Sequence, residues 1–88
     1  MDNITKLVGT RIRGFRKEKR LSQEELAEKC SLHPTYIGQL ERGEKNPTIE
    51  SVMKIANGLE IPIDQLFVNI TSSGATEINF QITRTMLY

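Results

Sequence analysis

The stretch that decides the fold is QEELAEKCSLHPTYIGQLER, residues 23–42. Ser22 stands before it and begins an S-x-x-E capping box, which is typical of a helix start. The second half begins at Pro34, which suits the first turn of a helix because its missing N–H would be unpaired there. Gly43 follows and indicates a helix stop in a left-handed conformation. The sequence therefore predicts two short helices joined by the tight connection Ser31-Leu32.

Three more helices are predicted around this pair. Residues 4–20 place apolar side chains at helical spacing with charges between them. A fourth helix begins after Thr48, an N-cap candidate, and Asn57-Gly58 is expected to end or fray it. A fifth, short helix follows Pro62. Five helices with short connections predict a compact all-α domain. The positions that keep the helical period in the fourth helix are Ile49, Val52, Met53, Ala56 and Leu59.

The C-terminal segment has a different pattern. Residues 70–74 form a polar link, and from Glu77 apolar and polar residues alternate, which is the period of a β-strand. Ile78, Phe80 and Ile82 share one side of this strand. We therefore predict a helical domain over residues 1–69 and a tail over residues 70–88 that contains a short strand.

The composition is that of one small domain with unevenly distributed charge. The 88 residues carry a net charge of +1, and 38% of them are hydrophobic. This is enough for a single core and too hydrophobic for a disordered chain. The first 20 residues hold seven basic residues against two acidic ones. Such a segment indicates either a polyanionic partner or a solvated helix face.

Several classes of protein are disfavoured. No apolar run approaches the ~18 residues of a membrane span, and residues 1–12 lack the apolar core of a signal peptide. Cys30 is the only cysteine, so no internal disulfide can form, and the reducing cytoplasm is the expected compartment. His33, the only histidine, has no ligand cluster beside it, so we expect a capping or DNA-edge role rather than a metal site. We expect no enzyme activity, no metal and no cofactor.

Residues 23–42 predict a helix-turn-helix, because so tight a connection forces two short helices to cross steeply. Such a pair can present its second helix to the major groove of DNA. The alternative is an ordinary corner in a helical bundle, and the spacing alone leaves both open.

The same stretch resembles the helix-turn-helix of Cro/repressor-type bacterial regulators. The similarity extends over residues 4–68. The chain most resembles short one-domain regulators such as restriction–modification controllers and phage-type repressors. Ser31 stands where this family usually has glycine, so it must accept a positive φ at a cost of about 1 kcal/mol. The matching features are Gln23, Leu26-Ala27, Tyr36-Ile37, Leu40-Glu41-Arg42-Gly43, the stretch Arg16-Lys17-Glu18-Lys19 and Asn46-Pro47-Thr48.

The resemblance implies a role for individual residues. Gln39 can pair with adenine through two hydrogen bonds, whereas Tyr36 has two readings, half-buried packing or a DNA contact. In similar domains an arginine matching Arg16 pairs with a glutamate matching Glu41, which ties the first helix to the third. The expected base contacts are Pro34, Thr35, Tyr36 and Gln39; the expected phosphate contacts are Gln23, Arg42, Lys45, Asn46, Arg13 and Lys17.

The predicted function is sequence-specific regulation of transcription. A homodimer on a palindromic operator is expected, because one short helix reads too few base pairs for useful specificity. The partners are double-stranded DNA and a second copy of the chain, with no membrane and no small molecule. The alternative is a protein-interaction module or antitoxin whose helical domain binds a partner protein. The expected dimer interface comprises Ile63, Leu66, Phe67, Ile78, Phe80 and Ile82; the competing interpretation of the tail is a segment that orders only on a partner protein.

Overall fold

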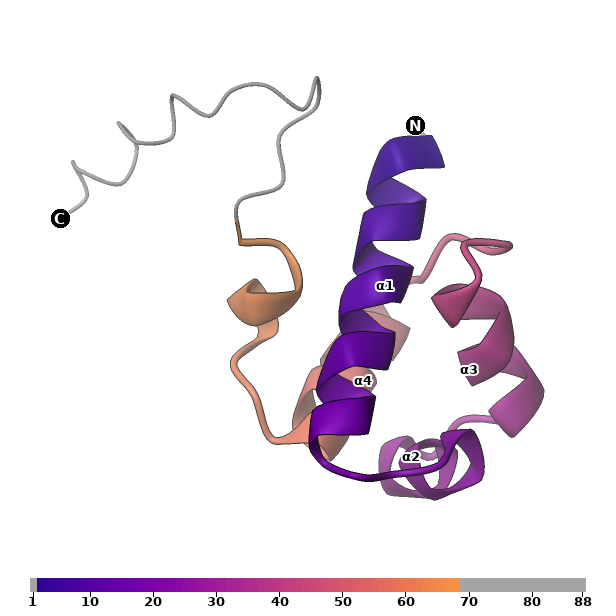
Figure 1. Ribbon diagram of the computed structural model, residues 1–88, viewed down its shortest axis with the longest axis vertical. Helices are drawn as coiled ribbons and strands as arrows, with labels where there is room; N and C mark the ends of the chain where they lie inside the picture. The colour runs from indigo at the N-terminus through magenta and orange to yellow at the C-terminus, as the bar shows by residue number, and fades with distance from the viewer. Residues whose placement is uncertain (1, 69–88) are drawn as a thin grey trace, which may run out of the picture.

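The computed structural model describes residues 2–68, which form four α-helices and one turn of 3-10 helix (Figure 1). The elements are α1 (Asp2–Glu18), α2 (Gln23–Cys30), α3 (Pro34–Glu41), α4 (Ile49–Leu59) and η1 (Ile63–Leu66). No strand occurs within residues 2–68, and the predicted strand over residues 77–83 lies outside them. Among these elements no helix is both long and apolar enough to cross a membrane.

The predicted fifth helix is only the single 3-10 turn η1. Its hydrogen bonds run from residue i+3 to residue i, from Gln65 to Pro62 at 3.0 Å and from Phe67 to Asp64 at 2.9 Å. A single turn with this bonding pattern is a 3-10 helix, which is typically used in such short pieces. The all-helical class is confirmed, and the count of five α-helices is not.

Helices α2, α3 and α4 start where the sequence predicts them, whereas α1 covers Asp2–Glu18 rather than residues 4–20. The Ser22 capping box is complete: the Glu25 amide donates to Ser22 Oγ at 3.0 Å, and the Ser22 amide donates to Glu25 Oε1 at 2.7 Å. His33 Nδ1 caps α3 by accepting from the Thr35 amide at 3.1 Å. Thr48 Oγ1 caps α4 in the same way. These bonds satisfy backbone donors that a helix start leaves free.

The helix ends are predicted less well. Ser31 has a φ of 58° and Gly43 a φ of 74°, both left-handed as expected. Helix α4, however, runs through Asn57-Gly58 and ends at Leu59, with Glu60 at a φ of 61°. Gly58 is retained inside the helix because α2 approaches it closely: a Cβ atom there would lie 2.6 Å from Cys30 Sγ.

A single core lies between the helices. Helix α1 packs on α3 through Gly9, where a Cβ atom would lie 2.1 Å from the Leu40 carbonyl oxygen. Two of the apolar positions that keep the helical period in α4 lie on the surface: Ile49 is 79% exposed and Met53 is 52% exposed. The other side of α4 faces the core, so these two apolar side chains remain on the surface. The buried apolar side chains are Val8, Ile12, Leu26, Ala27, Cys30, Ile37, Leu40, Val52, Ile55, Ala56, Leu59 and Leu66.

Candidate nucleic-acid interface

Helix α3 lies at the edge of the molecule, with its inner side packed on α1 and α2 (Figure 1). Ile37 and Leu40 point into the core, and Thr35 is exposed. Pro34 and Gln39 are half-buried and keep part of their surface toward solvent. A short helix whose outer side carries polar groups has the shape and chemistry required for the major groove.

Tyr36 packs against the core, which is one of its two predicted roles. Its ring is half-buried against the core, and its hydroxyl oxygen lies 3.1 Å from Ser51 Oγ in α4. The hydroxyl group is therefore engaged inside the domain. This geometry argues against the predicted base contact, because the side chain ties α3 to α4 instead of extending outward.

A buried ion pair joins α1 to α3. Arg16 Nε lies 2.6 Å from Glu41 Oε2, and Arg16 Nη2 lies 3.0 Å from Glu41 Oε1. The side chains are only 10% and 2% exposed. The hydrogen bond to Glu41 raises the pKa of the Arg16 guanidinium above its ordinary value, against the opposing effect of burial. Arg16 also donates to the Leu21 carbonyl oxygen at 2.8 Å, so its fork is satisfied on two sides.

Gln23 shares this network. Its Nε2 donates to Glu41 Oε1 at 3.0 Å, so part of the amide predicted to bind phosphate has a partner within the domain. Gly38 is buried beside it: a Cβ atom there would lie 3.3 Å from Gln23 Oε1 and 3.1 Å from Arg42 Nη1. The missing side chain at position 38 lets Gln23 and Arg42 converge. The structure thus brings two of the predicted phosphate contacts together.

Arg42 has an acidic neighbour that the sequence analysis overlooked. Its Nε lies 2.7 Å from Glu44 Oε2, and Nη2 lies 3.2 Å from Glu44 Oε1. The hydrogen bond from Arg42 lowers the pKa of the Glu44 carboxyl below its ordinary value. Both side chains are more than half exposed, so water screens their attraction. A DNA phosphate would have to compete with Glu44 for this guanidinium.

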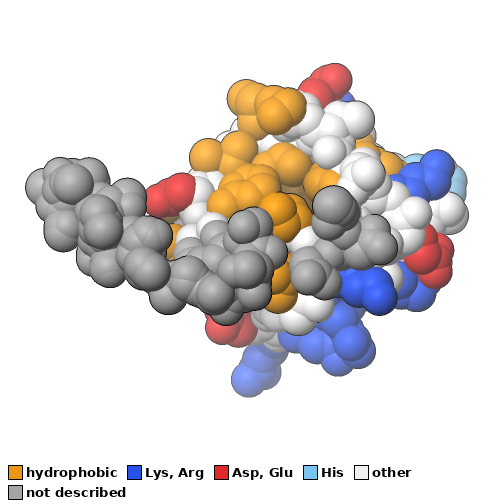
Figure 2. All heavy atoms as spheres, turned by 90° about the horizontal axis from the view of Figure 1, so that it is seen from above, with side chains coloured by type: hydrophobic (Ala, Val, Ile, Leu, Met, Phe, Trp, Pro, Cys, Tyr) orange, Lys and Arg blue, Asp and Glu red, His pale blue; other side chains and the backbone are white. Residues whose placement is uncertain are grey.

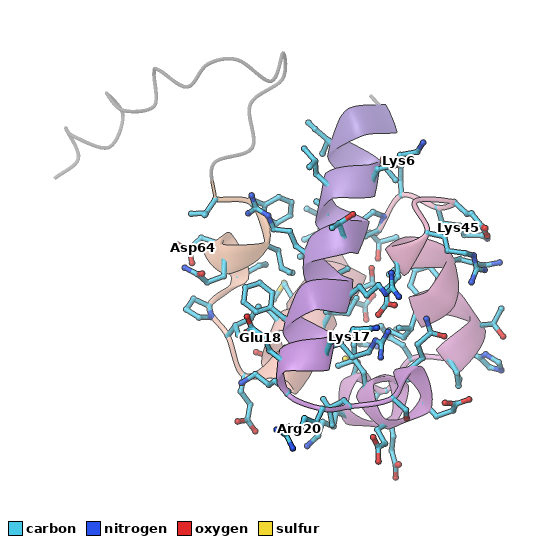
Figure 3. The ribbon with its side chains drawn as sticks, viewed as in Figure 1. Lys6, Lys17, Glu18, Arg20, Lys45 and Asp64 are labelled. Atoms are coloured by element: carbon cyan, nitrogen blue, oxygen red, sulfur yellow. The ribbon has the colours of Figure 1, made fainter. Side chains whose placement is uncertain are left out.

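The remaining predicted phosphate contacts lie at the end of α3 and along α1. Lys45 is exposed in the turn after α3, and Arg13 and Lys17 are exposed on α1. Figure 3 places Lys6 at the start of α1 near the turn that carries Lys45, with Lys17 toward the other end of the helix. Sequence analysis missed Lys6, although its spacing of seven and eleven residues from Arg13 and Lys17 puts all three on one side of a helix.

Asn46 has its partner in α1. Its Oδ1 accepts a hydrogen bond from Thr5 Oγ1, 41 positions earlier in the chain. We name the surface formed by α2, α3 and residues 42–47 the recognition face. It includes every predicted DNA contact except Arg13 and Lys17.

A second surface is apolar. It surrounds an open groove of about 280 Å³ between α1, α4, η1 and the turn before α4, and the lining includes Thr5 and Asn46. Figure 2 shows hydrophobic side chains gathered there, apart from most of the basic ones. Of the predicted dimer contacts, Ile63 and Phe67 are each 42% exposed here. Leu66 is fully buried in the core, so it has no surface to offer a partner, and the tail residues lie outside the described part of the chain. We name Ile4, Ile49, Ile63 and Phe67 the apolar face.

Within residues 2–68, no group of three or more His, Cys, Asp and Glu side chains could hold a metal ion. His33 acts as a helix cap, and Cys30 is buried against Gly58. Burial raises the pKa of the Cys30 thiol to about 11, which leaves it protonated at neutral pH and weakly reactive.

Known proteins share both the sequence and the fold. The control protein C.BamHI from Bacillus amyloliquefaciens is 38% identical over 77 residues, which cover 86% of this chain and 94% of that protein. The crystal structure of the restriction-modification controller protein C.AhdI from Aeromonas hydrophila is 37% identical, with a TM-score of 0.71 over 76% of this chain and 100% of that chain. The controller protein C.Esp1396I, solved as a tetramer with its natural 35 base-pair operator, is 39% identical, with a TM-score of 0.69 over 73% of this chain and 84% of that chain.

The helix-turn-helix family HTH_3 matches residues 12–66, more than half of the chain. The resemblance inferred from residues 23–42 and their surroundings is confirmed. The chain belongs to the XRE-type helix-turn-helix family HTH_3, a family of transcription regulators that includes the restriction–modification controller proteins.

Proposed function

We propose that this protein is a sequence-specific DNA-binding transcription regulator that acts as a homodimer on a palindromic operator. The observation that carries the proposal is the outer side of α3, where Thr35 is exposed, the half-buried Gln39 keeps part of its surface toward solvent, and Arg42 follows at the end of the helix. Gln39 reads a base edge, and Thr35 contacts a base or a thymine methyl group. The operator complex of the related C.Esp1396I supports this use of the fold.

Backbone contacts fix the position of α3 on the duplex. Lys45 and Asn46 in the following turn, Gln23 at the start of α2, and Arg13 and Lys17 on α1 contact phosphates on either side of the reading helix. The dipole of α2 favours an anion at its N-terminus, beside Gln23.

The apolar face joins two copies of the chain. Ile63 and Phe67 are large apolar side chains on the surface, and a two-fold axis makes such a patch complementary to itself. The tail strengthens this interface: its residues 77–83 pair antiparallel with the same residues of the second copy, with Ile78, Phe80 and Ile82 packed onto the helices. Each copy then reads one half-site.

The test is selection of operator DNA from a random duplex library by the full-length protein. The expected result is one motif of two inverted half-sites, with centres about 34–36 Å apart or a multiple of this distance. Thr35→Ala and Gln39→Ala should each lower the ratio of operator to random-DNA affinity, by an amount equivalent to about 1–3 kcal/mol of binding free energy.

The matched control is Glu60→Gln, an exposed residue at the end of α4 that belongs neither to the outer side of α3 nor to the apolar face. It should leave the ratio unchanged. Selection of no motif, or loss of the ratio equally in the control, would contradict the proposal. Selection of a single half-site would contradict the homodimer alone.

A further inference from the structure

The turn after α3 is supported from behind by the first turns of α1. Thr5 Oγ1 donates a hydrogen bond to Asn46 Oδ1. One residue later, Lys6 lies over Gly43, where an added Cβ atom would come within 2.7 Å of Lys6 Cγ. Gly43 also has a φ of 74°, so both its conformation and its contact favour glycine. Two side chains of α1 therefore hold the turn at both ends.

The bond from Thr5 determines which group Asn46 can offer to a partner. An asparagine amide carries an acceptor oxygen and a donor NH₂ group. Thr5 occupies the oxygen, and among the described residues no hydrogen bond involves the NH₂ group of Asn46. A phosphate accepts hydrogen bonds and would be repelled by the amide oxygen. An amide held in this orientation keeps its oxygen turned toward Thr5 and leaves its NH₂ group to donate to a phosphate.

We propose that Thr5 is a positioning residue of the DNA interface, which fixes the Asn46 side chain with its NH₂ group free to donate to a backbone phosphate. Thr5 itself touches no DNA. The inference rests on the proposed function and extends the binding machinery to the first turn of α1. Holding Asn46 in one orientation before binding also reduces the side-chain entropy that a contact would otherwise cost.

Thr5→Val tests this role, because valine has nearly the same shape and lacks the hydroxyl donor. In the full-length protein it should weaken DNA binding about threefold to tenfold, as expected for the loss of one hydrogen bond. The loss should be equal on operator and random duplexes, since a phosphate contact carries no sequence information. Thr5→Ser keeps the hydroxyl and should bind within about twofold of the unmodified chain.

A double-mutant cycle with Asn46→Ala separates positioning from a general structural effect. Asn46→Ala alone should weaken binding by at least as much as Thr5→Val, and adding Thr5→Val to it should cause no further loss. Thr10→Val, an exposed threonine on the same helix, is the matched control and should change nothing.

Three results would overturn the inference: unchanged binding by Thr5→Val, unchanged binding by Asn46→Ala, or additive losses in the double variant. Each presupposes that the unmodified protein binds its selected operator, so they leave the proposed function standing. If the unmodified protein binds no duplex, both the proposed function and this inference fail. Thermal unfolding of each variant identifies a loss of binding that comes only from unfolding.

Discussion

The recognition face and the apolar face are built in opposite ways. On the recognition face, polar side chains are held by other side chains: Gln23 by Glu41, Arg42 by Glu44, and Asn46 by Thr5. On the apolar face, large side chains such as Ile49 and Phe67 are exposed around an open groove. The first surface is oriented before it meets a partner, whereas the second gains stability only when something covers it.

The largest effect is expected from the buried ion pair that joins α1 to α3. Glu41→Ala would leave the Arg16 charge buried without its carboxylate, and we expect a loss of about 3–5 kcal/mol in the free energy of unfolding. Chemical denaturation measures it. Glu44→Ala, which breaks the exposed pair with Arg42, should change the free energy of unfolding far less, because water screens that pair. Equal losses in the two variants would show that burial of the Arg16–Glu41 pair has no energetic consequence.

Helices α2 and α4 pack on each other at Gly58. Gly58→Ala places a methyl group against Cys30 Sγ, and we expect a loss of about 1–3 kcal/mol through overpacking. Combining it with Cys30→Ala removes the obstructing sulfur and should recover part of the loss. Denaturation of the single and double variants tests this contact, and a Gly58→Ala chain as stable as the original would argue against it.

Introducing a charged side chain into the apolar face should weaken self-association. Phe67→Glu introduces a carboxylate into the proposed dimer interface, and we expect self-association to weaken by about tenfold or more, the equivalent of losing one buried aromatic side chain. Sedimentation at micromolar concentrations measures the change. Glu60→Gln, an exposed residue at the end of α4, is the control. An unchanged dimer constant would place the interface elsewhere.

The smallest expected effects lie within the turn after α3, where opposite charges should act in opposite directions. Lys45→Ala removes one phosphate contact and should lower the salt dependence of DNA binding by about one unit of slope. Glu44→Gln releases Arg42 and should raise that slope by up to about one unit. Titrations at several salt concentrations measure both. Slopes that move in the same direction would contradict the assignment of Arg42 and Lys45 to phosphates.

Local patterns predicted the recognition face, and distant contacts explain what they missed. Ser22, His33 and Thr48 begin their helices through bonds to residues two or three positions away, so the sequence alone locates them. The partner of Asn46 lies 41 positions earlier, and no local pattern identifies it. Position 58 shows the same limit: a glycine that breaks helices by propensity is kept inside one by the approach of another helix.

The helical period of α4 also left open which of its apolar side chains are buried. Periodicity places Ile49 and Met53 on the same broad stripe as Val52 and Ala56, and it cannot determine how much of the stripe the neighbouring helices cover. Helix α4 has only the short η1 beyond it, so one edge of the stripe stays exposed. The length of η1 is set by packing and hydrogen bonds that the sequence pattern does not reveal.

The left-handed helix ends have a consequence for heat tolerance. Arg20, Ser31 and Glu60 each carry a positive φ that glycine would adopt without the steric cost of about 1 kcal/mol. The three positions lie at the ends of α1, α2 and α4, away from the outer side of α3. In a domain of this size, about 1 kcal/mol corresponds to several degrees of melting temperature. Glycine at Arg20 and Glu60, which lie outside the connection between α2 and α3, should therefore raise the melting temperature by part of this amount, because glycine also adds entropy to the unfolded chain.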